Sequence, residues 1–249
     1  MMKKVFALVF LASVFCSLSA QKVNETVVLY GKEQIKGFTI NIYDNSPEIV
    51  EGALVDKFET QYKLKGSKKK GYHVYENQSC DAFGDARYDI YFTTAEIGKK
   101  KDKTTQVILV VSTGNLNCVT FSNDPRTSRN IVYFLENLNK DIDGYKIKLR
   151  IEELRNNLNS LNKERQSLLK EQAKLQEKRN TTNEEIKRLT AQIEQTTNLD
   201  EKQSLEKNLQ SSEKSLISLN EKLYKINVKL ENNQKNIDST EKELNSLTK

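Results

Sequence analysis

The sequence predicts an α+β fold: a two-layer sandwich with a mainly antiparallel sheet and two helices, followed by a long antiparallel coiled-coil helical hairpin. All nine glycines and both prolines of the 249 residues lie between Gly31 and Gly144. Before this boundary apolar residues alternate as in strands, and after it leucine and isoleucine recur at coiled-coil spacing. The boundary separates a globular head, residues 21–143, from the hairpin, residues 144–249.

Short alternating or apolar runs, bounded by turn residues, predict the strands of the head. In the longest run Tyr88, Ile90 and Phe92 fall on one face of a strand. Residues 106–112 are apolar almost throughout, as in a strand buried on both faces. Short links between the last strands favour an antiparallel meander. The predicted strands cover residues 26–30, 38–43, 72–75, 86–97, 106–112 and 117–121.

Two amphipathic helices are predicted to cover this sheet. Pro47 takes the first helical position of one helix, where its missing N–H costs nothing, and an apolar stripe continues to about Tyr62. Asp124 and Pro125 provide a cap and first residue for the other helix. About 120 residues are enough chain for one hydrophobic core.

The second half of the chain contains two series of core positions that are out of phase across residues 196–205, the second beginning at Leu205. Folding the chain at 196–200 pairs the series in layers: Ile193 with Leu205, Leu175 with Leu223, and Ile151 with Leu247.

Turning the chain back at 196–200 also places Arg165 opposite Asn233. Asp200 with Gln203 resembles a capping box for the return helix. The nearly equal arms also favour a turn over a stutter in one helix. A break at 179–185 is the alternative, but the core spacing runs straight through it.

The N-terminus has the features of a cleaved secretory signal peptide, residues 1–20, with a basic start and a short apolar run. We place the cleavage before Gln21, with a cut after Ser19 as the alternative. The run is too short to span a bilayer. The bulky Phe15 before Cys16 argues against lipid attachment there. The mature protein is therefore expected to be periplasmic or secreted, without a membrane span.

Two cysteines, Cys80 and Cys118, remain after cleavage. An even number of cysteines in an oxidising compartment predicts a disulfide between them. Two buried free thiols are the alternative, because sequence alone does not show that the two Cα atoms lie close enough.

The catalytic motifs that we sought are not in the sequence. His73 is the only histidine, so a Cys80–His73 nucleophile pair is the one conceivable thiol site. Asp81, Asp85 and Asp89 do not have the spacing of a calcium loop. We therefore predict no catalytic residue, cofactor, metal or small-molecule ligand.

Charge gives no reason to expect nucleic acid as a partner. The formal net charge of +6 falls to +4 when two lysines leave with the signal peptide (6 − 2), and no basic face stands out. The lysine clusters at 67–71 and 98–103 are expected to be solvated turns.

These features predict an exported bacterial envelope protein that is not an enzyme. The head would carry a coiled-coil stalk acting as an interaction, docking or scaffold module, with a protein partner or self-association through the coiled coil. The alternative is a periplasmic or secreted enzyme with its site in the head, near Cys80, His73 and Asp85.

Overall fold

The computed structural model of the protein describes residues 22–98 and 104–249, so the predicted signal peptide lies outside the described residues. The chain divides into two compact units, the first ending at Lys146 and the second beginning at Ile147. We call them the head and the hairpin and describe each by itself. In the described part of the chain, no helix is both long and apolar enough to cross a membrane.

The head contains one six-stranded antiparallel sheet, which confirms the predicted α+β class. Its strand order is β1-β2-β6-β5-β4-β3, so β2 pairs with the last strand of the meander that follows it. The strands are β1 (Asn24–Tyr30), β2 (Glu33–Tyr43), β3 (Ser67–Lys69), β4 (Tyr72–Cys80), β5 (Gly84–Ile97) and β6 (Thr104–Ser112).

Two of the β-hairpin turns in the head depend on residues in the left-handed region of backbone conformation. Gly31 has φ +67° between β1 and β2, and Lys70 and Gly71 have φ +51° and +82° between β3 and β4. Two-residue turns of this hand match the twist of the strands that they join. In the second turn Gly71 adopts its positive φ without the Cβ penalty, whereas Lys70 adopts it despite that penalty.

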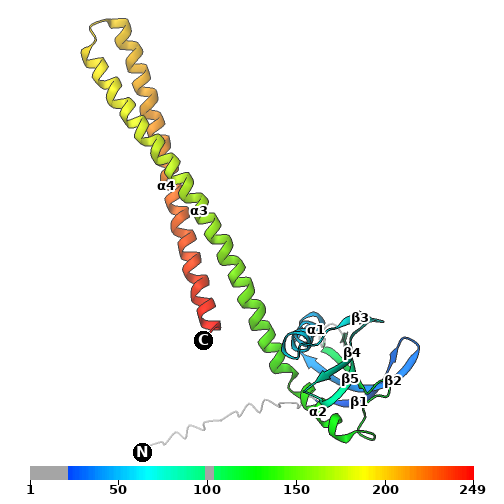
Figure 1. Cartoon of the computed structure of the whole chain (residues 1–249). Helices are drawn as coiled ribbons and strands as arrows, with labels where there is room; N and C mark the ends of the chain where they lie inside the picture. Colours follow the sequence, from blue (N-terminus) through cyan, green and yellow to red (C-terminus); the bar gives the residue numbers. More distant parts are fainter. Residues whose placement is uncertain (1–21, 99–103) are drawn as a thin grey trace, which may run out of the picture. The chain divides into compact units, whose positions relative to one another are not determined.

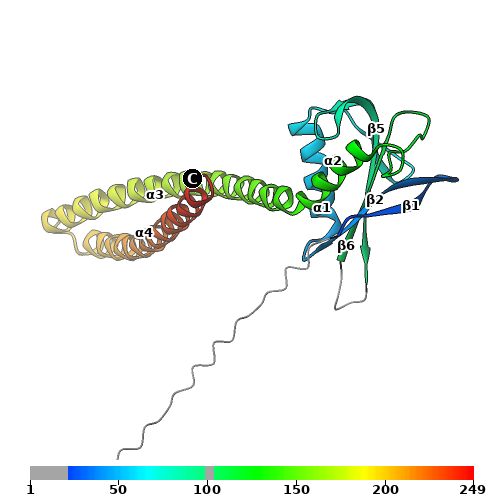
Figure 2. The ribbon, with the colours of Figure 1, turned by 90° about the horizontal axis from the view of Figure 1, so that it is seen from below.

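The helices lie on one face of the sheet (Figure 2). Helix α1 (Pro47–Val55) continues as the π-helical segment η1 (Asp56–Gln61), which agrees with the predicted end near Tyr62. Helix α2 (Pro125–Glu136) begins as predicted, because the Asp124 side chain accepts a hydrogen bond of 3.0 Å from the Thr127 N–H. The pKa of Asp124 is lowered, mainly by this backbone hydrogen bond.

Alternation along the strands divides the buried residues into two clusters. On β5, Ile90 and Phe92 face the main cluster under the helices, while Tyr91 faces a smaller cluster on the opposite side of the sheet. In this second cluster the rings of Tyr30 and Tyr72 lie edge to face with centroids 5.6 Å apart. The Tyr72 hydroxyl also donates to the Leu29 carbonyl over 3.2 Å, so the end of β1 reaches β4 across this face.

Two segments of the head differ from the prediction. Residues 117–121 are not a strand: they make one isolated bridge, Ser112 with Cys118, because the Asn123 side chain binds the Cys118 carbonyl and the Thr120 N–H in place of a strand partner. Residues 67–69, expected within a solvated turn, form the short edge strand β3.

The second unit confirms the predicted helical hairpin (Figure 1). Helix α3 (Leu138–Gln195) passes through 179–185 without interruption, so the alternative break is wrong. The capping residue of helix α4 (Leu199–Leu247) lies two residues before the predicted one: the Asn198 side chain, not that of Asp200, accepts from the first backbone N–H groups. The shorter turn follows because asparagine is itself a preferred capping residue.

Candidate functional site

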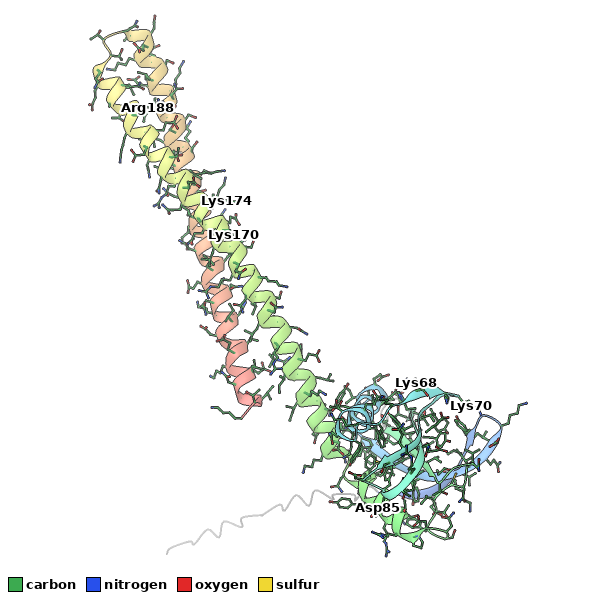
Figure 3. The ribbon with its side chains drawn as sticks, viewed as in Figure 1. Lys68, Lys70, Asp85, Lys170, Lys174 and Arg188 are labelled. Carbon is green, nitrogen blue, oxygen red and sulfur yellow. The ribbon has the colours of Figure 1, made fainter. Side chains whose placement is uncertain are left out.

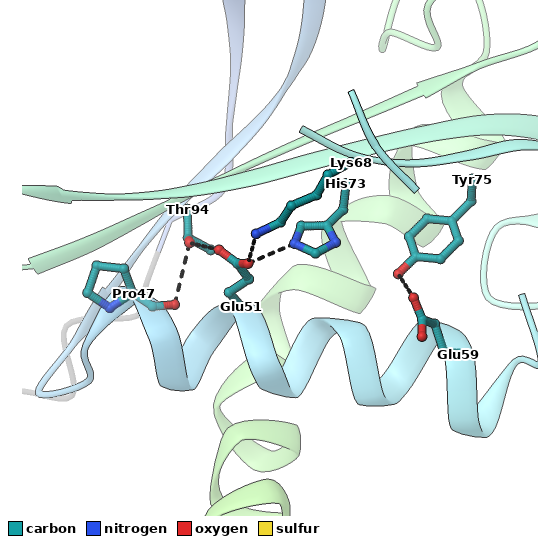
Figure 4. A network of polar contacts seen from close by, with 7 residues as sticks. All are labelled: Pro47, Glu51, Glu59, Lys68, His73, Tyr75 and Thr94. Carbon is teal, nitrogen blue, oxygen red and sulfur yellow. Dashed lines mark hydrogen bonds and ion pairs between the residues drawn. The ribbon is translucent and has the colours of Figure 1, made fainter. Parts of the chain in front are cut away.

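The most connected polar cluster of the head centres on the Glu51 carboxylate (Figure 4). Glu51 comes from α1 and accepts a hydrogen bond from Lys68 Nζ of β3 over 2.6 Å. Its Oε1 also lies 2.8 Å from His73 Nε2 of β4, and the Thr94 hydroxyl of β5 approaches its other oxygen at 3.5 Å. One carboxylate therefore joins the helix to three strands.

Electrostatics favour the ionised form of this carboxylate. The pKa of Glu51 is lowered, first by the hydrogen bond from Lys68 and then by His73, and partial burial opposes the shift. The His73 ring is stacked on Phe92, with centroids 4.7 Å apart and planes within 5°. A carboxylate that orients an imidazole can serve general acid–base catalysis. Here the same carboxylate also binds Lys68, and the imidazole face is covered, an arrangement that holds α1 against the sheet.

The structure does not bring His73 together with Cys80 and Asp85 in one site. His73 and Cys80 lie near opposite ends of β4, and the polar partner of His73 is Glu51. Burial raises the pKa of the Cys80 thiol to about 11, so little reactive thiolate is present near neutral pH. Asp85 is exposed at the start of β5, and Figure 3 shows it on the opposite side of the head from Lys68.

The predicted disulfide between Cys80 and Cys118 is not formed: both are buried free thiols. Cys80 belongs to the main cluster under the helices, whereas Cys118 belongs to the cluster on the other face of the sheet. The sheet itself separates the two sulfur atoms. Within residues 22–98 and 104–249, no group of three or more His, Cys, Asp or Glu is placed to hold a metal ion.

A second polar contact, which the sequence analysis missed, joins η1 to the first turns of α3. Lys57 forms an ion pair with Asp141, and both side chains are largely buried. Lys57 Nζ also lies 5.0 Å from the centroid of the Phe134 ring. The π-helical segment and α3 are far apart in sequence, so only the folded chain shows this pair.

In the hairpin, polar side chains cross the seam between α3 and α4. The seam residues Ser212, Asn233 and Thr240 are buried. Hydrogen bonds across the seam join Arg150 with Glu243, Asn157 with Thr240, and Gln172 with Asn227. These partners fall close to the predicted register and show that the helices are antiparallel.

Asn233 is predicted to face Arg165 across the seam, but its partners in the structure are different residues. Asn233 donates to the Leu161 carbonyl and to the Glu164 carboxylate, each over 3.1 Å, whereas Arg165 is exposed. A guanidinium loses much hydration energy when buried, and its long side chain can reach solvent from a seam position. The neighbouring Glu164 and the backbone therefore replace Arg165 as partners.

The face of α4 that points away from the seam carries three exposed large apolar side chains. Ile217 is 60% exposed, Tyr224 71% and Val228 38%. They lie at i, i+7 and i+11, which places them on one side of the helix. We call these three residues the outer stripe. Elsewhere charged side chains project from the hairpin, as Lys170, Lys174 and Arg188 do from α3 in Figure 3.

Comparison of the chain with models of protein families, with curated proteins and with solved structures found no match. Its function must therefore be argued from the geometry described above.

Proposed function

We propose that this chain is an exported, non-catalytic interaction protein of the bacterial envelope, in which the hairpin is the binding arm and the head is its scaffold. The observation that carries this proposal is the outer stripe, Ile217, Tyr224 and Val228. Large apolar side chains grouped on one exposed helix face are typical of a protein-binding surface.

The stripe is not needed to hold the hairpin together. The hairpin buries its own seam, where Leu154, Leu223 and Ile237 are almost fully covered. Polar contacts such as Gln172 with Asn227 fix the register of the two helices. A helix that is already paired on its seam can use its opposite face for a partner.

The polar contacts of the head suit a scaffold. Glu51 binds Lys68 and His73, and Lys57 binds Asp141, so each charged group in these two contacts has a partner within the fold. Such pairs orient elements of the fold, and breaking one leaves a partly buried charge without compensation.

Export is the second part of the proposal and rests on the signal-like residues 1–20. Mass spectrometry of protein recovered from the periplasm or the medium should find a mature chain that begins at Gln21. Full-length protein confined to the cytoplasm would contradict export and leave the binding role to be judged on its own.

The binding role is tested by crosslinking in cells that produce the tagged chain. Ile217→Lys with Tyr224→Lys should remove the crosslinked species seen with the natural chain, because two charges replace the apolar contact. Ser211→Lys with Ser218→Lys is the matched control, since it adds two lysines with the same spacing on a neighbouring exposed face of α4. The proposal is wrong if both double variants give the crosslinks of the natural chain.

A further inference from the structure

The outer stripe belongs to a longer series with the spacing of a coiled-coil seam. Exposed residues follow one another on α4 at steps of three, four, three, four and three. The series is Lys214, Ile217, Glu221, Tyr224, Val228 and Glu231. It lies on the side of α4 turned away from α3, so the helix has one occupied seam and one open one.

The order of steps in this series is the same in both directions. An antiparallel second copy of α4 can therefore bring every residue of the series opposite another one. Lys214 then faces Glu231 of the second copy, Ile217 faces Val228, and Glu221 faces Tyr224, whose hydroxyl can donate to the carboxylate. By symmetry each layer occurs twice, giving two ion pairs at the ends and two apolar layers inside them.

Other arrangements of two α4 helices place like charges together or put an apolar residue opposite a charge. In a parallel pair, Lys214, Glu221 and Glu231 would each face their own copy. A shift of one heptad in one direction puts Glu221 opposite Glu231, and a shift in the other puts Ile217 opposite Glu221. Like charges in facing positions destabilise a helix pair. Only the antiparallel register pairs opposite charges and apolar residues together.

The residues on either side of the series fit the same register. One heptad before Lys214 is Lys207, which would face Asp238 of the second copy, and Gln210 would face Lys235. Within the described residues, Lys214 has no ion-pair partner. Glu231 contacts Lys235 over 2.7 Å, but both side chains are about two-thirds exposed, so the carboxylate can also accept a second cation.

We propose that the outer face of α4 binds a second copy of this chain, with the two α4 helices antiparallel and centred between Glu221 and Tyr224. This inference rests on the proposed binding role of the outer stripe and names its partner. On each helix the interface runs from Lys214 to Glu231, a distance of 17 residues or about 26 Å. An interface of this size belongs to the weak class, so dimer and monomer exchange.

Sedimentation of the chain from Gln21 onward tests the charge pattern. The natural chain should dimerise with a Kd on the order of 10–100 μM. Lys214→Glu and Glu231→Lys should each weaken dimerisation about tenfold or more, since each makes two like-charged layers. The double variant, which exchanges the two charges, should restore it. Lys222→Glu, at an exposed position of α4 that lies about 80° or more round the helix from every residue of the series, is the control and should leave the Kd unchanged.

Cysteine crosslinking tests the orientation. A mixture of Ile217→Cys and Val228→Cys chains should form a disulfide between copies, because these positions face each other. Ile217→Cys alone should not, because its own copies are three layers apart. The natural thiols are buried, and the unmodified chain serves as the background.

The inference is overturned if the chain stays monomeric at about 200 μM, or if Lys214→Glu has no more effect than Lys222→Glu. Circular dichroism of each variant shows whether the helices are intact. If the chain is monomeric but its crosslinks in cells still disappear with Ile217→Lys and Tyr224→Lys, only the second copy is ruled out as the partner. If the chain is monomeric and the crosslinks in cells do not depend on the outer stripe, the binding role is ruled out as well.

Discussion

Glu51 shows how much of the head depends on a single charged side chain. It lies on α1, yet its partners Lys68 and His73 come from β3 and β4, so it links elements that no local pattern joins. The sequence predicts the helix and the strand, because each has its own periodicity. It cannot predict the contact, which arises only when the helix packs on the sheet.

Replacing Glu51 should destabilise the head at neutral pH. Glu51→Gln removes the charge that Lys68 and His73 bind, at a cost of about 1 kcal/mol in the free energy of unfolding, reduced by the partial exposure of the site. The folded-state pKa of Glu51 lies below its ordinary value of 4.5. The contacts of the Glu51 carboxylate therefore stabilise the head above pH 4.5, and this stabilisation is lost as the pH falls through the folded-state pKa.

Denaturant unfolding of the natural chain and Glu51→Gln at several pH values measures this difference. The two free energies should converge under acid conditions. Glu76→Gln is the control, because the Glu76–Lys69 pair is exposed and its removal should change stability by less than about 0.5 kcal/mol. A difference between the natural chain and Glu51→Gln that grows on acidification would contradict the assignment.

The two thiols should be protected rather than bonded. Because burial raises the pKa of Cys80 from 9.0 to about 11, its thiolate is about a hundredfold scarcer than that of an ordinary thiol. Alkylation without reductant should modify neither cysteine in the folded chain and both after unfolding. A mass lower by two hydrogen atoms, with no alkylation after unfolding, would show the disulfide instead. The number of cysteines predicted a bond, but their positions on opposite faces depend on the packing of the loop at 113–121.

At the scale of elements, local signals determine where helices begin and end. Asp124, Pro47 and the heptad spacing of the hairpin all predicted what the structure shows. The short strand β3 has lysines in place of an apolar pattern, so only its pairing with β4 reveals it. Residues 117–121 carry a strand-like pattern, but the Asn123 side chain binds the Cys118 carbonyl and the Thr120 N–H, so pairing with β6 does not continue.

The seam of the hairpin contains a polar layer that should cost stability. Asn233 is 3% exposed, and its Oδ1 is buried without a partner among the described residues. Asn233→Leu should therefore raise the midpoint of thermal unfolding by several degrees, consistent with a gain of about 1 kcal/mol. Circular dichroism of the full chain measures it. A lower midpoint would mean that the bonds to Leu161 and Glu164 contribute more than an apolar contact.

At the scale of the molecule, the first turns of α3 belong to the head. Leu138 and Ile142 are fully buried in the main cluster, and the Tyr145 hydroxyl packs against Gly52, where a Cβ would lie only 2.6 Å from it. The sequence places the boundary at Gly144 because glycine and proline end there. The compact unit instead ends at Lys146.

Truncation tests this part of the head. A fragment of residues 22–146 should fold, whereas 22–137 should not, because it loses two buried aliphatic side chains worth about 2–5 kcal/mol each. That loss is comparable to the whole stability of a small domain. Thermal unfolding followed by circular dichroism distinguishes the fragments. Equal midpoints for both would show that the head is complete without α3.

The central claim is that the chain turns back on itself at 196–198 and so forms an arm of two antiparallel helices. Spin labels at Asn156 and Lys242, both exposed and in facing layers, measure this most directly. They are introduced as cysteines in a Cys80→Ala, Cys118→Ala chain diluted with unlabelled protein. Since packed helix axes lie about 8–10 Å apart, the account predicts a label separation of about 20–30 Å within one chain. A separation near 130 Å, the span of one unbroken helix at about 1.5 Å per residue, would contradict it.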